Sequence, residues 1–492
     1  YRIFFPANMG REGLFFYLAA LVAHFAPLSH FSLKLTSALV GIATIPALYL
    51  LARRLFNPSV AFGAAFLLAV NRWHIVLSRA GFRVILLPLF VILLFHALVR
   101  ALHSYRLFDF ALAGLVLGLG LHAYLPFLLA PVAIVTGFAL LVLSGRRLHW
   151  RSLLPLLAIM FAVALAVYAP LGRFAIEHRQ EYLQRMALQT RMLKGEAETA
   201  AISLPAFAEN LRRTLLMFNL YGDGNSRFNV PYFRHFGFVS GVLLVLGGFY
   251  ALRRWRQGNN SVLLAVSFIF ILPSALAALP NEMPNCFRAA GCIGPALTLA
   301  ALPLPAIGKC LQDLSVSWPK WDVLVRFSVS SMGEVYESVW RIGRRSLLVL
   351  APMLSVVLLL VLEGKETAGF YFHDFVNVLP DNQNVSVAKE MARQMEAYGD
   401  LSSCCIKLWP HWFDGRALRT YLRREEAEWG EFDDLVPGQP PLSSITERAL
   451  FIVHPDDSEG LAVLRDAFPH CVTKPYLFPN GTPAFILIYV ER

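Results

Sequence analysis

Residues 83–144, RVILLPLFVILLFHALVRALHSYRLFDFALAGLVLGLGLHAYLPFLLAPVAIVTGFALLVLS, decide the fold of this chain. They contain three apolar runs, at 83–101, 107–122 and 126–144. A helix needs roughly 20 apolar residues to cross the hydrocarbon core of a bilayer, and somewhat fewer when neighbouring helices cover its ends. The runs are separated by a few residues only, so they indicate successive transmembrane helices joined by short loops.

The same pattern extends over most of the chain. Further apolar runs occupy 34–52, 58–72, 152–169, 236–252, 261–279, 287–306 and 346–363. With a mean hydropathy of +0.54 and 16% charged residues, the 492-residue chain is not an ordinary soluble enzyme. We therefore predict a polytopic α-helical membrane protein with about ten spans.

Charge divides the chain into two parts. Residues 1–363 carry 32 Lys and Arg against 14 Asp and Glu, whereas residues 364–492 carry 12 against 19. The second part also alternates helical patterns with strand patterns. The helical patterns are VSVAKEMARQMEAYG and SEGLAVLRDAF, and the strand patterns are CCIKLW, RALFIVH and PAFILIYV. We predict a membrane domain of residues 1–363 and a small α/β domain of residues 364–492. The net charge of +11 lies mostly in membrane loops, so no nucleic acid partner is expected.

The basic loops predict the orientation of the chain. They lie at every second turn and include Arg53-Arg54, residues 100–106, 146–151, 253–256 and 309–345. The positive-inside rule places such loops in the cytoplasm. We therefore expect a multi-pass protein of the cell (inner) membrane. The C-terminal domain would be extracytoplasmic, as would the segments 1–33, 72–82, 122–126, 170–235 and 280–286.

One apolar run interrupts this alternation. Residues 12–28, EGLFFYLAALVAHFAPL, resemble a span, but a crossing here would put every later basic loop outside. We interpret them as a helix in the outer interface, and the alternative is a true span that forms a hairpin with the next helix. In the outer segment 170–235, RFAIEHRQEYLQRMALQTRML and LPAFAENLRRTLLMF are predicted as amphipathic helices.

The cysteines leave two alternatives open. Either Cys404 or Cys405 bridges to Cys471 in an oxidising compartment, or all three are free thiols. Because successive residues of a strand point to opposite faces, at most one of the adjacent pair can bond to Cys471.

Arginines on the predicted outer face require an anionic partner, because they oppose the charge bias of the loops. Arginine binds phosphate through two parallel hydrogen bonds, and the anion available at that depth is a lipid phosphate or pyrophosphate. The alternative is that these arginines bind ordinary lipid headgroups or pair with Glu12, Asp223 and Glu282, and we favour this alternative for Arg72. The candidates for phosphate binding are Arg79, Arg83, Arg288 and, beside them, His74.

Two carboxylates lie in the same outer segments. Glu12 precedes an apolar helix, where it could simply favour the helix N-terminus. Asp223 stands between two glycines, where an Asp is usually a turn residue. Their functional alternative is a position near the acceptor of a reaction.

An ordered set of segments resembles a known family. GREGLFFYL, SALVGIATIPALYLLARRLF and WHIVLSRAGFRVILLPLF are followed by LRRTLLMF, GDGNSRFNVP and MPNCFRAAGCIGP. This order is similar to that of bacterial integral-membrane glycosyltransferases of family 39. These are relatives of the protein O-mannosyltransferases and of the lipid A aminoarabinose transferases.

The resemblance implies a C-type glycosyltransferase fold and a function. Such enzymes transfer a sugar from a polyprenyl-phosphate-linked donor to a protein, lipid or glycan on the outer face, typically with inversion. Arg79, Arg83, Arg288 and His74 would then hold the donor phosphate, and Glu12 and Asp223 would be catalytic candidates near the acceptor. Arg11, Tyr124, Arg227 and Asn229 would line the cavity. No metal ligand is assigned, and a divalent metal stays an open alternative.

The chain also departs from the family. The family's acidic catalytic residue lies in the first outer loop, so we expect the base and a first transmembrane helix to precede Tyr1. No carboxylate follows Ser78-Arg79, which argues against protein mannosylation specifically. The alternative function is a catalytically silent structural subunit of a larger membrane assembly. A transporter is less favoured, because the apolar runs show no pair of broken helices in related halves.

Overall fold

The computed structural model describes residues 2–5, 10–27, 29–182, 204–225, 228–276, 283–316, 354–378, 384–409, 412–424, 426, 428–433, 435, 448–478 and 481–491. The chain forms two compact units, Tyr1–Val378 and Leu379–Arg492, and each is described by itself. The predicted domain boundary at 363/364 lies inside the helical residues 354–369, which belong to the first unit.

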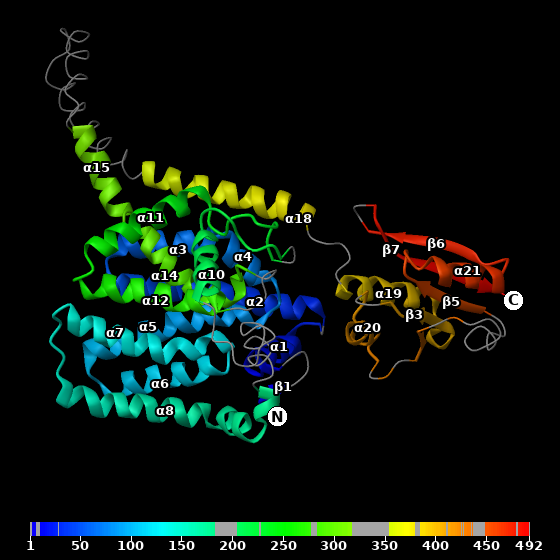
Figure 1. Cartoon of the computed structure of the whole chain (residues 1–492), viewed down its shortest axis with the longest axis horizontal. Coiled ribbons are helices and arrows are strands. Elements are labelled where there is room, and N and C mark those ends of the chain that lie inside the picture. The colour runs from blue at the N-terminus through cyan, green and yellow to red at the C-terminus, as the bar shows by residue number, and fades with distance from the viewer. Residues whose placement is uncertain are drawn as a thin grey trace, which may run out of the picture. The chain divides into compact units, whose positions relative to one another are not determined.

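The first unit is a bundle of helices (Figure 1). Its α-helices are α1 (Leu14–Phe25), α2 (His30–Leu55), α3 (Pro58–Val70), α4 (Arg72–Arg79), α5 (Leu86–Ser104), α6 (Leu107–Leu121), α7 (Ala130–Leu143), α8 (Trp150–Glu177), α10 (Leu204–Leu216), α11 (Phe238–Arg253), α12 (Gly258–Ala275), α13 (Cys286–Ala289), α14 (Ile293–Ala301) and α15 (Leu304–Val316). The helical residues 354–369 continue through a π-helix, Phe370–Asp374, into α18 (Phe375–Val378). Short 3₁₀ turns stand at Arg83–Ile85 (η1), Leu125–Leu129 (η2) and Ala290–Cys292 (η4).

The bundle confirms a multi-pass membrane protein, but not the predicted count of about ten spans. Among the described residues, six helices are long and apolar enough to cross a membrane, or seven if α3 and α4 form one span bent by 55°. The predicted runs at 107–122 and 236–252 are the shorter apolar helices α6 and α11. These two helices were counted as spans because their composition is apolar, although they have only 15 and 16 residues.

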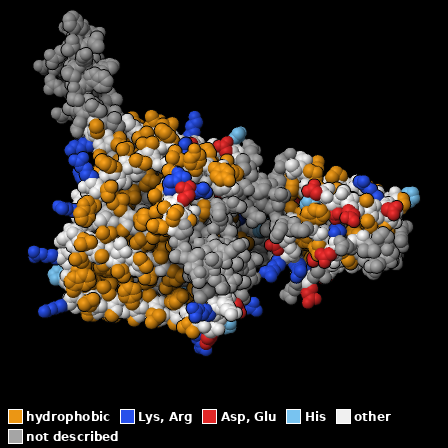
Figure 2. All heavy atoms as spheres, viewed as in Figure 1, with side chains coloured by type: hydrophobic (Ala, Val, Ile, Leu, Met, Phe, Trp, Pro, Cys, Tyr) orange, Lys and Arg blue, Asp and Glu red, His pale blue; other side chains and the backbone are white. Residues whose placement is uncertain are grey.

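The surface of this unit is apolar over a wide area. Figure 2 shows hydrophobic side chains covering much of its visible face, and Lys and Arg side chains project from its left edge. Large apolar side chains such as Val135, Leu143 and Leu165 are about two-thirds exposed. A soluble domain rarely exposes so large an apolar area, whereas a lipid-facing surface requires it.

Two predicted outer helices are present in the described residues. The run at 12–28 forms α1, which has 12 residues and is too short to cross a bilayer alone. This length favours the interfacial interpretation. The segment LPAFAENLRRTLLMF forms α10. The first residues of the predicted helix at 173–193 belong to the end of α8, and residues 183–193 lie outside the described residues.

The second unit is an α/β domain, as the sequence predicts. Its five strands are β3 (Cys404–Lys407), β4 (Gly430–Phe432), β5 (Arg448–Val453), β6 (Val472–Leu477) and β7 (Pro483–Glu491), in the order β4-β3-β5-β7-β6. β3 is parallel to β4 and β5, and β7 is antiparallel to β5 and β6. Its helices are α19 (Asn384–Tyr398), α20 (Gly415–Leu422) and α21 (Ser458–Ala467). The patterns predicted β3, β5, β7, α19 and α21, and missed β4, β6 and α20.

The adjacent cysteines of β3 point to opposite faces of the sheet, as expected from strand geometry. Cys404 lies in the core with Val387 and Met391, and Cys405 lies in the core on the other face with Phe451. Cys471 packs against the second of these cores, and all three cysteines are free thiols in the structure.

Candidate functional site

A pocket of about 230 Å³ brings four of the predicted site residues together. They come from four separate segments: the strand β2 (Arg11–Glu12), the turn η1, the residue before η2, and α13. Its polar lining residues include Glu12, Arg83, Tyr124 and Arg288. Its apolar wall includes Leu125, Leu128, Leu129, Pro273 and Leu276.

Glu12 and Arg83 form a buried ion pair at this pocket. The strands β1 (Phe4–Phe5) and β2 pair antiparallel just before α1, and this pairing holds Glu12 with only 4% of its surface exposed. Arg83 is 2% exposed, and its Nε lies 3.3 Å from Oε2 of Glu12. The guanidinium also lies over the ring of Tyr124, 5.4 Å from its centroid. A cation–π contact of this kind stabilises a charge that has left water.

Arg288 adds a second cation to the same pocket. It lies on the single turn of α13, where the side chain of Asn285 accepts a hydrogen bond from the backbone N–H of Arg288. Among the residues that the structure describes, the pocket is lined by two arginines and one carboxylate. Two arginines beside an apolar wall suit an anionic group that is attached to a hydrocarbon chain.

Arg11 lies beside this pocket. Its guanidinium is 5.6 Å from the ring centroid of Phe82, the residue that precedes Arg83. The structure thus places a further predicted residue on the same short segment as the ion pair.

Two predicted phosphate-binding residues do not line the pocket. His74 is buried, and its Nε2 lies 3.2 Å from the carbonyl oxygen of Gly41, so it joins α4 to α2. Arg79 is exposed at the end of α4, with its guanidinium 5.2 Å from the ring centroid of Tyr371. The two residues are close to Arg83 in sequence, but they belong to α4, whereas Arg83 begins η1 after a turn at Gly81.

Asp223 and Asn229 organise a loop instead of lining the pocket. The carboxylate of Asp223 accepts hydrogen bonds from the backbone N–H groups of Asn225 and Cys286. The amide of Asn229 donates to the carbonyl oxygens of Asp223 and Phe233. Both residues are almost fully buried. Arg227 lies outside the described residues.

Two side chains of this loop and one from α13 form a group that could hold a metal ion. Ligand atoms of Asp223, His235 and Cys286 all lie within 4.8 Å of one another, and all three residues are buried. Burial lowers the pKa of His235 below its ordinary value, which favours the neutral imidazole that binds metals. Carboxylate, imidazole and thiolate are ligands of zinc, but a thiol must lose its proton to bind.

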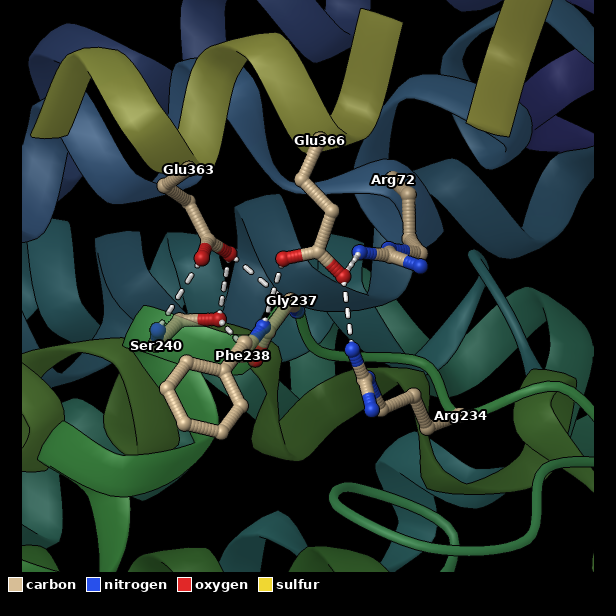
Figure 3. A network of polar contacts seen from close by, with 7 residues as sticks. All are labelled: Arg72, Arg234, Gly237, Phe238, Ser240, Glu363 and Glu366. Atoms are coloured by element: carbon tan, nitrogen blue, oxygen red, sulfur yellow. Dashed lines mark hydrogen bonds and ion pairs between the residues drawn. The ribbon is translucent and has the colours of Figure 1, made fainter. Parts of the chain in front are cut away.

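Sequence reasoning missed two carboxylates on the helix of residues 354–369. Figure 3 shows Glu363 and Glu366 pointing from this helix toward the start of α11. Glu363 accepts hydrogen bonds from the backbone N–H groups of Gly237 and Ser240, each at 3.1 Å. Glu366 accepts from the N–H of Phe238 at 2.7 Å. The spacing of the two residues, one helical turn apart at the end of an apolar run, was the available signal.

Arg72 completes this network, which we call the carboxylate clamp (Arg72, Arg234, Gly237, Phe238, Ser240, Glu363 and Glu366; Figure 3). Nη2 atoms of Arg72 and Arg234 lie 2.6 and 2.8 Å from Oε1 of Glu366. Arg72 also lies near the rings of Phe233 and Phe370, 5.1 and 4.9 Å from their centroids. Arg72 thus forms an ion pair, which is one of the two alternatives expected for it, but its partner is Glu366 and none of the expected carboxylates.

Comparison with known proteins supports the fold. Residues 14–172 match the family model of the dolichyl-phosphate-mannose-protein mannosyltransferases. The structure is similar to ArnT from Cupriavidus metallidurans in the apo state, with 14% identity and a TM-score of 0.54 over 96% of this chain and 86% of that chain. It is also similar to ArnT from the same organism bound to undecaprenyl phosphate, with 14% identity and a TM-score of 0.56 over 97% and 87%.

A third structure is less similar. The archaeal oligosaccharyltransferase AglB from Archaeoglobus fulgidus, in complex with an inhibitory peptide and a dolichol-phosphate, has 15% identity and a TM-score of 0.48 over 100% of this chain and 68% of that chain. No curated protein matches the sequence. The family match and the ArnT structures confirm the predicted likeness to family 39 and the C-type glycosyltransferase fold.

Proposed function

We propose that this chain, which has the C-type glycosyltransferase fold, transfers a sugar from a polyprenyl-phosphate-linked donor to an acceptor. The observation that carries the proposal is the pocket in which two arginines, Arg83 and Arg288, lie beside an apolar wall. A polyprenyl phosphate has the matching chemistry, because it joins an anionic head to a long hydrocarbon chain. The ArnT structure with undecaprenyl phosphate shows that a protein of this fold binds such a lipid.

Each pocket residue has a role in this proposal. Arg83 and Arg288 bind the donor phosphate, and Glu12 and Tyr124 keep Arg83 in place. Leu125, Leu128 and Leu276 contact the first part of the prenyl chain. Asp223 and Asn229 shape the loop that precedes α11, and the alternative role of Asp223 is as a metal ligand.

The reaction follows from this placement. The acceptor hydroxyl attacks the anomeric carbon, its proton passes to a base, and the bond between that carbon and the phosphate oxygen breaks. The phosphate leaves with the electron pair, so negative charge develops beside the two arginines. Preorganised cations stabilise such charge most strongly where water is excluded. Attack from the face opposite the leaving phosphate inverts the anomeric centre.

The predicted orientation of the chain indicates on which side of the membrane the reaction takes place and where the acceptor is found. The positive-inside rule supports a pocket and a second unit on the extracytoplasmic side of the inner membrane, because it assigns the basic loops to the cytoplasm. The acceptor is therefore a protein, lipid or glycan of the cell envelope.

A matched pair of arginine variants tests the proposal. Arg288→Ala should lower both the binding of undecaprenyl phosphate to the purified full-length chain and the transfer of sugar in membranes, by about 100-fold for transfer. Arg79→Ala is the control, because Arg79 is another arginine of the predicted outer face and lies outside the pocket. Both variants and the wild type are compared in cells that lack the native chain, with mass spectrometry of envelope glycans as the second measurement.

Two outcomes would contradict the proposal. One is a wild-type chain that binds no undecaprenyl phosphate and changes no envelope glycan, which would favour a structural subunit. The other is an equal loss in Arg79→Ala and Arg288→Ala, which would show that the pocket has no special part in the reaction.

A further inference from the structure

A second cavity lies between helices of the first unit, away from the candidate site. Its volume is about 100 Å³. α5 and α7 line it with stripes at helical spacing, and α12 contributes residues from its first turns. The stripe on α5 is Phe95, Leu98, Val99 and Leu102, and that on α7 is Ile134, Gly137, Phe138 and Leu141.

This cavity and the candidate site lie toward opposite ends of the same helices. α5 follows Arg83 of the candidate site and reaches the cavity with its second half, up to His103. α12 runs the other way, since Asn259 and Val262 line the cavity and Pro273 lines the candidate site. The two sites therefore face opposite sides of the membrane. The basic loops place the second cavity on the cytoplasmic side.

The second cavity has an apolar interior and cations at its rim. Arg54 comes from the last turn of α2, and Arg146 from the loop after α7. Both arginines are exposed, and neither has a carboxylate partner in the part of the chain that the structure describes. The imidazole of His103 also lines the cavity, and its Nδ1 lies 2.6 Å from the carbonyl oxygen of Val99.

A polar pocket of about 430 Å³ adjoins this cavity. The two share Leu55, Leu141, Arg146 and Asn259. The adjoining pocket also includes Ser144, Gln257 and Asn260, which supply amide and hydroxyl groups. An apolar slot is thus joined to a polar compartment through a shared arginine, and this arrangement matches an amphiphile with an anionic head.

We propose that this composite cavity binds an anionic phospholipid of the cytoplasmic leaflet. Arg54 and Arg146 contact the phosphate, the amides of the adjoining pocket contact the rest of the head, and one acyl chain enters between α5 and α7. Basic pockets between transmembrane helices on the cytoplasmic side recognise anionic lipid heads in this way. This site is separate from the pocket of Glu12, Arg83, Tyr124 and Arg288, which we call the donor pocket. The proposal does not depend on sugar transfer.

The chain supplies matched controls for a test. Arg53 and Arg147 are exposed, each is adjacent to one of the two rim arginines, and neither lines the cavity. The full-length chain is purified as wild type, as Arg54→Gln with Arg146→Gln, and as Arg53→Gln with Arg147→Gln. Native mass spectrometry then measures how much phosphatidylglycerol and phosphatidylcholine each protein retains from mixed vesicles.

We expect the wild type and the Arg53/Arg147 variant to prefer phosphatidylglycerol, and the Arg54/Arg146 variant to lose about 10-fold in that preference. Equal preference in the two double variants would overturn the proposal, as would a wild type without preference. If the protein retains inorganic phosphate but no lipid, the two arginines bind a free anion, and this result would also overturn the proposal.

Gly137→Leu tests the apolar part of the cavity. A Cβ atom at Gly137 would meet only Val262, at 3.7 Å and 4.0 Å, so a larger side chain can extend into the space. The variant should retain less phosphatidylglycerol than wild type at an unchanged melting temperature. Unchanged retention in a folded Gly137→Leu protein would show that no acyl chain enters, and the arginine variants decide the case if this variant does not fold.

Discussion

The donor pocket and the carboxylate clamp are both built from arginines and glutamates. They differ in the number of carboxylates and in whether a cavity is left between the side chains. The clamp has two arginines and two glutamates, and its carboxylates are saturated by hydrogen bonds from Gly237, Phe238 and Ser240. Among the described lining residues, the donor pocket has two arginines and one glutamate. They lie beside an apolar wall, and a cavity is left open between these side chains. The comparison teaches that an arginine on this face gains a binding role from its surroundings and not from its position in the sequence.

The largest expected effect comes from removing the buried arginine of the donor pocket. Arg83→Ala should lower sugar transfer by about 100- to 1000-fold, because it removes a cation from the site where phosphate charge develops. Arg83→Lys keeps the positive charge but loses the planar guanidinium, which can donate two parallel hydrogen bonds to a phosphate. We therefore expect an intermediate loss of sugar transfer. Transfer is measured in membranes at matched protein levels, and equal activity of Arg83→Ala and wild type would remove the pocket from the mechanism.

Substitutions in the carboxylate clamp should lower the stability of the protein and leave its affinity for undecaprenyl phosphate unchanged. Glu363→Ala leaves the buried N–H groups of Gly237 and Ser240 without this carboxylate, and each orphaned group costs about 1–3 kcal/mol. We expect a lower melting temperature in detergent with undecaprenyl phosphate affinity retained. The control is Glu177→Ala, since Glu177 forms a solvent-exposed pair with Arg173, and surface pairs of this kind contribute little to stability. A folded Glu363→Ala protein that has lost lipid binding would show that the clamp belongs to the site.

Arg72→Gln gives the smallest effect and sharpens the comparison further. The substitution removes a charge-assisted hydrogen bond to Glu366, which is worth about 1.5–3 kcal/mol, while Arg234 still contacts the same carboxylate. Stability should fall, and undecaprenyl phosphate should bind within about 3-fold of wild type. This bound corresponds to less than 1 kcal/mol. A tenfold loss of binding without a change in melting temperature would make Arg72 a donor contact.

Apolar composition and basic loops predicted a multi-pass membrane bundle, and period-two and helical patterns predicted much of the second unit. These signals depend on residues that are close in sequence, so they can be interpreted without knowing how the helices and strands pack. The number of spans was harder to predict, because α6 and α11 are as apolar as the longer helices. β6 was missed because its strand VTKPYL contains a proline and alternates poorly.

The site was predicted in part for a similar reason. The argument that outward arginines require an anionic partner found Arg83 and Arg288, which line the pocket, but it also chose Arg79 and His74, which do not. The chain turns between α4 and η1, where Gly81 has a φ of 66°, and no spacing rule shows where such a turn directs a side chain. Arg72 and Glu366 lie 294 residues apart, so the clamp is visible only after folding.

A photoreactive polyprenyl phosphate, with its reactive group on the first isoprene unit, tests the central claim most directly. The lipid is cross-linked to the purified full-length chain and the modified peptides are sequenced. The account predicts labelling of Leu125–Leu129 and of Pro273 or Leu276, which form the apolar wall beside Arg83 and Arg288, and loss of this labelling in Arg288→Ala. Labelling spread over the lipid-facing surface, unchanged in Arg288→Ala, would contradict it.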